Sequence, residues 1–157
     1  MEVVTTPIPG LLLLRPPRPG DGTILCAAVG ETLASGWIAS GPQVTAFEAA
    51  LSARFGGRPV RALTSATASM SVALELVGVG PGDEVIVPAQ TFFACANVVE
   101  RAGARVVFVD VDLATRNADL AAAEAAVNPR TRVFLPTHFN APLDPDALAA
   151  FAKRHGV

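Results

Sequence analysis

The stretch that decides the fold is a turn running into a short strand, Gly80-Pro81-Gly82-Asp83-Glu84-Val85-Ile86-Val87-Pro88. Glycine and proline are the residues that tight turns demand, so a loop is predicted over residues 78–83. Residues 84–87 predict a strand, and their apolar run is typical of a strand covered on both faces. The glycines follow a predicted helix and precede this strand. They therefore do not form a dinucleotide-binding fingerprint, which must follow a strand and open a helix.

Strands and helices alternate on both sides of this central strand. Further strands are predicted at residues 60–63, 105–109 and 132–135, and helices at residues 67–77, 91–101, 119–127 and 144–155. The first of these helices is apolar nearly all round, which predicts burial on both sides. The alternation predicts an α/β fold with a mostly parallel sheet and helices on both faces. Because Gly156 and Val157 fall where another strand would begin, the sheet is expected to be incomplete.

The sequence before this alternation has a different character. Residues 1–20 are rich in proline and predict an extended N-terminal arm, whereas residues 21–157 are expected to form one incomplete domain. Residues 21–33 carry a weak helical pattern. A clearer helix is predicted at residues 44–55, and two glycines follow it as a C-cap would.

Composition excludes several classes of protein. The chain has 157 residues, is 51% hydrophobic and carries a net charge of -2, which is typical of a globular protein and offers no basic stripe for nucleic acid. The longest aliphatic run, residues 11–14, is too short to cross a membrane. Cys26 and Cys95 are too few for a disulfide framework, and no Cys/His cluster has zinc-ligand spacing. A cytoplasmic, reduced protein without a metal site is expected.

A phosphate-binding bend is one interpretation of the first strand-to-helix junction. Small residues let a backbone approach an anion, and the free N–H groups of a helix start point at it. The hydroxyl of Ser65 or Thr67 could add a donor. A Ser/Thr N-cap without any ligand explains the same pattern. The junction reads Leu63-Thr64-Ser65-Ala66-Thr67-Ala68-Ser69-Met70.

Other polar and aromatic residues follow the later strands, at the carboxyl edge where open α/β sheets bind ligands. Phe92 could lie flat on a heteroaromatic ring or belong to the core. His138 could be a ligand, a base or a hydrogen-bonded edge histidine. Asp110 and Asp112 favour a capped, solvated turn over a catalytic pair of carboxylates. Cys95 has no activating neighbour in sequence and is interpreted as a small apolar filler.

Taken in order, these motifs resemble the DegT/StrS family of sugar-nucleotide aminotransferases. The family is dependent on pyridoxal 5'-phosphate (PLP) and has the aspartate-aminotransferase fold (fold type I), of which this chain would be the N-terminal part of the large domain. The resemblance covers residues 30–157. It is carried by Ser35-Gly36-Trp37-Ile38-Ala39-Ser40-Gly41-Pro42, Ser65-Ala66-Thr67-Ala68, residues 80–88, Thr91-Phe92, Val107-Phe108-Val109-Asp110-Val111-Asp112, Pro129-Arg130-Thr131-Arg132 and Pro136-Thr137-His138.

The resemblance implies roles for particular residues. The turn containing Ala66 and Thr67 would hold the cofactor phosphate, and Phe92 would stack on the pyridine ring. Trp37 and His138 would lie on the sugar-nucleotide side. Ala66 and the Gln90-Thr91 pair are similar to the branch that makes UDP-4-amino-4-deoxy-L-arabinose, although that branch has tryptophan at the Phe92 position. Phe139-Asn140-Ala141 departs from the usual tyrosine-glycine segment.

The resemblance also implies a reaction and partners. PLP would carry an amino group, commonly from glutamate, to a keto-sugar nucleotide used for polysaccharide, lipopolysaccharide or antibiotic sugars. The family works as a homodimer. Its Schiff-base lysine and pyridinium aspartate are expected beyond Val157, and Lys153, the single lysine, does not match the motif. The chain alone is therefore expected to hold no catalytic residue and to be inactive, as a truncated product or one half of a split enzyme that a C-terminal half would complement.

Three alternatives stay open at this point. The chain could come from a sugar dehydratase of the same fold, in which histidine replaces the lysine. It could also be an inactive partner or regulatory fragment of a full-length paralogue. The last alternative is a phosphate-binding module of another α/β class.

Overall fold

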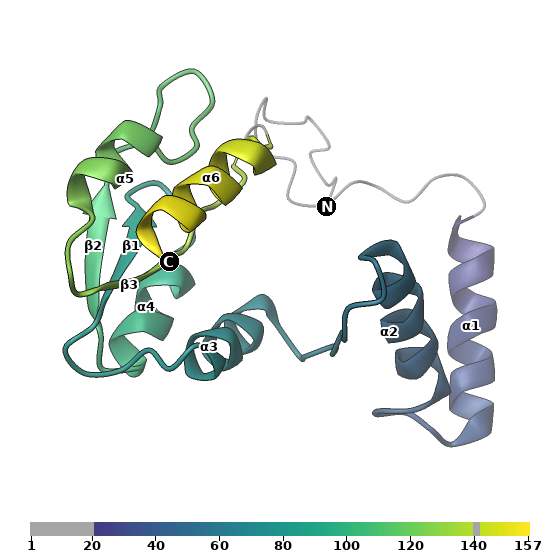
Figure 1. Cartoon of the computed structure of the whole chain (residues 1–157). Coiled ribbons are helices and arrows are strands. Elements are labelled where there is room, and N and C mark those ends of the chain that lie inside the picture. Colours follow the sequence, from purple (N-terminus) through teal and green to yellow (C-terminus); the bar gives the residue numbers. More distant parts are fainter. Residues whose placement is uncertain (1–20, 140–141) are drawn as a thin grey trace, which may run out of the picture. The chain divides into compact units, whose positions relative to one another are not determined.

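The computed structural model describes residues 21–139 and 142–157. The predicted arm at residues 1–20 lies outside the described residues, as do Asn140 and Ala141. The chain divides into two compact units, Met1–Ala62 and Leu63–Val157. Figure 1 shows the elements of both units, coloured along the sequence.

The described part of the first unit contains two helices, α1 (Asp21–Ser35) and α2 (Pro42–Arg54). Pro42 occupies the first turn of α2, where the N–H that proline lacks would have no helical partner. Residue 41 must be glycine or force a shift, because a Cβ there would lie 2.9 Å from the Trp37 Cβ. After α2 the chain passes through Gly56 and Gly57 with φ of 71° and 79°. These left-handed conformations confirm the predicted glycine ending.

The second unit is a parallel α/β layer structure. Its central strand β1 pairs with β2 on one side and β3 on the other, and both pairings are parallel. Ile86 lies opposite Val107 of β2 and Phe134 of β3. The elements in chain order are α3 (Ala66–Leu76), β1 (Glu84–Pro88), α4 (Ala94–Arg101), β2 (Arg105–Val109), α5 (Leu120–Ala126), β3 (Thr131–Phe134) and α6 (Pro145–His155).

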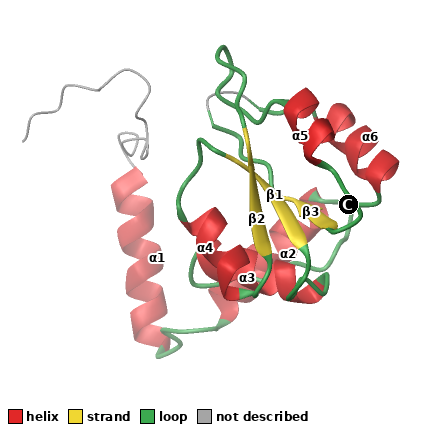
Figure 2. Cartoon of the chain, turned by 90° about the vertical axis from the view of Figure 1, so that its left-hand side faces the viewer, coloured by secondary structure: helices red, strands yellow, loops and turns green. Residues whose placement is uncertain are grey.

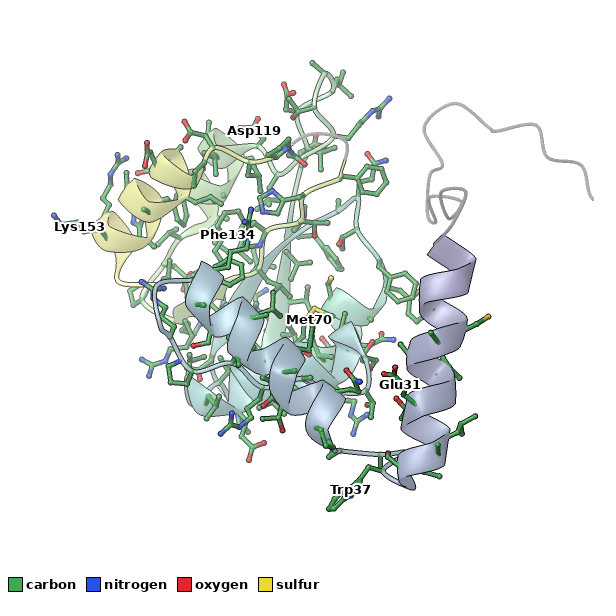
Figure 3. All side chains as sticks on the ribbon, turned by 90° about the vertical axis from the view of Figure 1, so that its right-hand side faces the viewer. Glu31, Trp37, Met70, Asp119, Phe134 and Lys153 are labelled. Carbon is green, nitrogen blue, oxygen red and sulfur yellow. The ribbon has the colours of Figure 1, made fainter. Side chains whose placement is uncertain are left out.

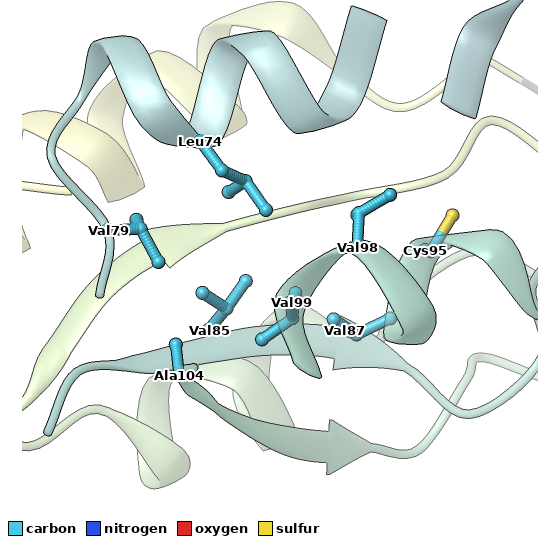
Figure 4. Close-up of a cluster of buried hydrophobic side chains, with 8 residues drawn as sticks. All are labelled: Leu74, Val79, Val85, Val87, Cys95, Val98, Val99 and Ala104. Carbon is cyan, nitrogen blue, oxygen red and sulfur yellow. The ribbon is translucent and has the colours of Figure 1, made fainter. Parts of the chain in front are cut away.

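Helices cover both faces of this sheet, as the sequence predicted (Figure 2). On one face, α3 and α4 enclose a cluster centred on Val85 and Val87 (Figure 4). On the other face, Ile86 packs with residues of β2, α5 and α6. Successive side chains of a strand point to opposite faces, so β1 contributes to both clusters and all five of its residues are buried. The first cluster contains Leu74, Val79, Val85, Val87, Cys95, Val98, Val99 and Ala104; the second contains Ile86, Val109, Ala123 and Phe151.

The strand predicted at residues 60–63 is wrong. These residues have no regular secondary structure and belong to no sheet, and the sheet of the described residues has three strands. The N–H of Ala62 donates to the Glu48 carboxylate on α2 at 2.8 Å. A strand exists only where a neighbouring strand takes its backbone groups. Here a side chain takes that position, and Leu63 is 45% exposed.

The predicted burial of α3 on both sides is also wrong. Leu74 is the one buried residue of the helix, whereas Val72 and Leu76 are exposed. Apolar residues all round a helix predict two covers, and within the second unit the sheet and α4 supply one of them. Its outer face is therefore an apolar surface.

A buried carboxylate ties the amino ends of the strands together. Glu84 of β1, 1% exposed, accepts from Arg105 of β2 at 2.7 Å and from Arg130, just before β3, at 2.6 Å. Its second oxygen accepts from Asn128 at 2.8 Å. The hydrogen bond from Asn128 and those from the two arginines lower the Glu84 pKa from 4.5 to about 2. The charged groups of the amino edge are thus paired with one another.

Candidate functional site at the carboxyl edge

The connections that follow the neighbouring strands β1 and β3 lead to opposite faces of the sheet. The loop after β1 leads to α4 on one face, and the loop after β3 leads to α6 on the opposite face. Where neighbouring connections diverge in this way, a crevice opens at the carboxyl ends of the strands, and ligands of open α/β folds bind there. The candidate residues that the sequence indicated after these two strands therefore belong to one edge.

The bend before α3 has the backbone geometry of a capped helix start. Ser65 is the N-cap with extended backbone, and its Oγ accepts from the N–H of Ala68 at 3.1 Å. Its carbonyl accepts from the N–H of Ser69 at 3.0 Å. In the part of the chain that the structure describes, no acceptor takes the N–H groups of Ala66 and Thr67. Ser65 is thus the N-cap that one interpretation predicted, and two N–H groups remain available for a phosphate.

Phe92 is an exposed ring, not a core residue. Its side chain is 62% exposed, and its ring centroid lies 4.3 Å from that of Phe93, with the planes tilted by 44°. The N–H of Cys95 donates to the Phe92 carbonyl at 2.9 Å, so the backbone turns into α4 directly after the two rings. The core interpretation of Phe92 is therefore wrong. An open aromatic face at the carboxyl edge suits a flat heteroaromatic ring.

His138 is hydrogen-bonded through one ring nitrogen. Its Nδ1 accepts from the N–H of Leu143 at 2.8 Å, so the proton of the neutral ring resides on Nε2. The next residue is held as well, because the N–H of Phe139 donates to Asn117 Oδ1 at 2.8 Å. Asn117 is buried in the segment after β2. The histidine is thus an edge residue of the loop after β3, and within the described residues its Nε2 makes no hydrogen bond.

Two threonines whose hydroxyls received no role in the sequence analysis join this edge. Thr91, after β1, and Thr137, after β3, have their hydroxyl oxygens 2.7 Å apart. They stand 46 positions apart in the sequence, in the motifs Thr91-Phe92 and Pro136-Thr137-His138, and the sequence analysis gave neither hydroxyl a role. No local sequence signal could have paired them. The contact shows that the loops carrying Phe92 and His138 meet at the carboxyl edge.

Other selected residues stand apart from this edge or serve the fold. Trp37 belongs to the first unit, where its side chain is 61% exposed. Lys153 lies in the last turn of α6, exposed, with its side chain directed away from the sheet (Figure 3). Asp112 is a turn residue as predicted: its carboxylate accepts from the N–H and hydroxyl of Thr115, and these bonds lower its pKa. Cys95 is buried, as predicted for a filler.

Two classes of function find no support among the described residues. No group of three or more His, Cys, Asp and Glu side chains in the described ranges could hold a metal ion. Within the same ranges, every helix falls short of the length and hydropathy needed to span a bilayer.

Solved structures that share this fold are PLP-dependent aminotransferases. A 3-amino-5-hydroxybenzoic acid synthase is 44% identical with a TM-score of 0.69, over 74% of this chain and 31% of that protein. A DegT/DnrJ/EryC1/StrS aminotransferase from Brucella abortus is 34% identical with a TM-score of 0.79, over 86% and 38%. NtdA from Bacillus subtilis, bound to pyridoxamine 5'-phosphate (PMP), is 31% identical with a TM-score of 0.79, over 87% and 32%.

The family assignment follows from the sequence as well as from these structures. Residues 22–157 match the DegT/DnrJ/EryC1/StrS aminotransferase family, and the chain belongs to that family. The family depends on PLP, which confirms the predicted cofactor class. The chain spans about a third of the length of the three solved structures, from 31% to 38%.

Proposed function

We propose that this chain forms the phosphate-binding and ring-stacking part of an aminotransferase that transfers an amino group to a keto-sugar nucleotide. The bend before α3 carries the proposal, because it offers the N–H groups of Ala66 and Thr67 to an anion. These groups belong to the same compact unit as the exposed ring of Phe92. A phosphate and a flat pyridine ring are the two parts of PLP that such groups would hold.

The chain's own residues bind and orient in this proposal. Ala66 and Thr67 hold the phosphate through backbone N–H groups, and the small side chain of Ala66 lets the anion approach. Phe92 covers one face of the ring. His138 presents Nε2 towards the substrate side, and Trp37 is assigned to that side through the family resemblance. When bound, PLP supplies an electron sink and carries the amino group.

The proposal includes a donor and an assembly. Glutamate is the expected amino donor, and a cytoplasmic homodimer, or an assembly with a complementing C-terminal half, is the expected form. Lys153 is not assigned as the Schiff-base lysine, because its side chain is exposed and points away from the sheet (Figure 3). We therefore expect no turnover from the described residues alone.

The acceptor could belong to two chemical classes. Ala66 and the Gln90-Thr91 pair favour the 4-keto-arabinose nucleotide, as in the sequence interpretation. The 44% identity to a 3-amino-5-hydroxybenzoic acid synthase favours a second candidate, a carbocyclic ketone without a nucleotide. A nucleotide supplies a diphosphate and a base that a carbocycle lacks. Binding of UDP to the PMP-loaded chain would therefore favour the sugar nucleotide, and its failure to bind would favour the carbocycle.

Calorimetric titration with three matched probes tests the proposed function. The probes are PMP, pyridoxamine without the phosphate, and inorganic phosphate. The proposal predicts that PMP binds more tightly than either part, because the bend and Phe92 act together. Equal affinity for PMP and inorganic phosphate would reduce the site to a general anion site. No binding of PMP at all would refute the proposal outright.

A further inference from the structure

A continuous line of polar contacts crosses the carboxyl edge beneath the candidate site. The hydroxyl of Thr137 lies 2.7 Å from that of Thr91. Thr91 Oγ1 donates to Cys95 Sγ at 3.3 Å, and Cys95 Sγ donates to Met70 Sδ at 3.8 Å. Cys95 is buried and the other three residues are half-buried.

The line has one consistent direction. Each hydroxyl or thiol carries a single hydrogen. With Thr91 as the donor to Cys95, Thr137 is the donor in the contact between the two threonines, where either hydroxyl can donate. Cys95 in turn gives its hydrogen to the Met70 thioether, which accepts only. The hydrogens therefore run from Thr137 to Thr91, Cys95 and Met70, and no donor is left unused inside the line.

Three of the four residues in this line lie next to, or one helical turn from, a candidate residue. Thr137 is the immediate neighbour of His138, and Thr91 is the immediate neighbour of Phe92. Met70 lies on α3, one turn after the bend at Ala66 and Thr67. The phosphate bend, the stacking ring and the histidine loop are thus fastened to one another by these four side chains.

We propose that Thr91 and Thr137 are positioning residues, which set the place of the Phe92 ring relative to the phosphate bend. The inference rests on the proposed function. Among the described residues, the one ring packed on Phe92 is that of its neighbour Phe93, so packing does not place the pair of rings. The position of the two rings depends on the backbone at Thr91, whose side chain is fixed by the contacts with Thr137 and Cys95. Neither threonine is expected to touch the cofactor phosphate.

Replacing threonine with valine removes the side-chain hydroxyl and leaves a side chain of nearly the same shape. Thr137→Val and Thr91→Val break the line, whereas Thr137→Ser keeps the hydroxyl. Thr131→Val is the control: Thr131 Oγ1 accepts from the N–H of Asn128 at 3.0 Å, at the opposite edge of the same sheet. It removes one hydroxyl contact from the same unit, far along β3 from the crevice.

The readout is the ratio of affinities for PMP and inorganic phosphate, measured by calorimetry. Loss of one hydrogen bond predicts that Thr137→Val and Thr91→Val lower this ratio about fivefold, chiefly through PMP. Thr137→Ser should keep the wild-type ratio of affinities, and so should Thr131→Val. Urea unfolding of each variant shows that it is folded at the temperature of the titration.

Two failures are distinguishable. If the wild-type chain prefers PMP but Thr137→Val keeps the full preference, the positioning role is wrong and the proposed function stands. The same conclusion follows if Thr131→Val lowers the ratio as much as Thr137→Val does. If the wild-type chain shows no preference for PMP, the proposed function is overturned and this inference falls with it.

Discussion

Replacing Phe92 with alanine tests whether this residue binds the cofactor or only stabilises the core. Truncating a fully buried phenylalanine costs about 3–5 kcal/mol of unfolding free energy. Phe92 is 62% exposed, so its truncation should cost less than about 1.5 kcal/mol. Stacking of an aromatic side chain on a heteroaromatic ring contributes about 1–3 kcal/mol. Phe92→Ala should therefore weaken PMP binding by about 5- to 150-fold while urea unfolding changes little.

Phe108→Ala provides the control for this prediction. Phe108 lies on β2 and is 58% exposed, so its truncation should have a similarly small effect on stability. Its ring has no assigned role, and PMP affinity should stay at the wild-type value. Both variants are measured by calorimetry and by urea unfolding. The reasoning is refuted if Phe92→Ala binds PMP as the wild-type chain does, or if it unfolds as easily as a variant with a truncated core.

Three further predictions concern the core, the amino edge and the lysine. Leu74→Ala, which removes a side chain that is 3% exposed at the centre of the first cluster, should lower the unfolding free energy by about 2–5 kcal/mol in urea. The folded-state pKa of Glu84 lies at about 2, below its usual 4.5, so the stability that this carboxylate contributes should be complete above about pH 4.5 and lost as the pH falls towards 2. Urea unfolding at several pH values should show that Glu84→Gln lacks this acid-dependent loss of stability. A loss of the same size in Glu84→Gln would contradict the assignment. Lys153→Ala should leave the visible absorbance spectrum of the chain with PLP unchanged, and a band that disappears in this variant would identify Lys153 as a cofactor lysine.

The sequence predicted the layers of the second unit because its strands are short, mostly apolar runs that alternate with helices, and the central strand is buried on both faces. The central strand at residues 84–87 is the clearest case, and its neighbours at 105–109 and 132–135 were found within one residue of their observed bounds. The strand at residues 60–63 failed for a physical reason. An apolar extended segment becomes a strand only through a partner, and the Ala62 N–H bonds to Glu48 instead.

The sequence indicates the chemistry of the candidate site but not its contacts. Small residues and a serine at residues 65–67 indicate a phosphate bend, since capping and anion binding depend on local backbone geometry. The exposure of Phe92 depends on what covers the ring, and sequence spacing does not contain that information. The bond from Leu143 to His138 and the contact between Thr91 and Thr137 arise from the fold of the loops. They could only be found once the two loops were placed.

A crystal structure of the chain soaked with PMP tests the central claim most directly. The proposed function predicts phosphate oxygens about 2.7–3.2 Å from the backbone nitrogens of Ala66 and Thr67, with the pyridine ring lying against Phe92. Density for PMP elsewhere, or a bend that stays empty while its N–H groups turn to protein acceptors, would contradict it.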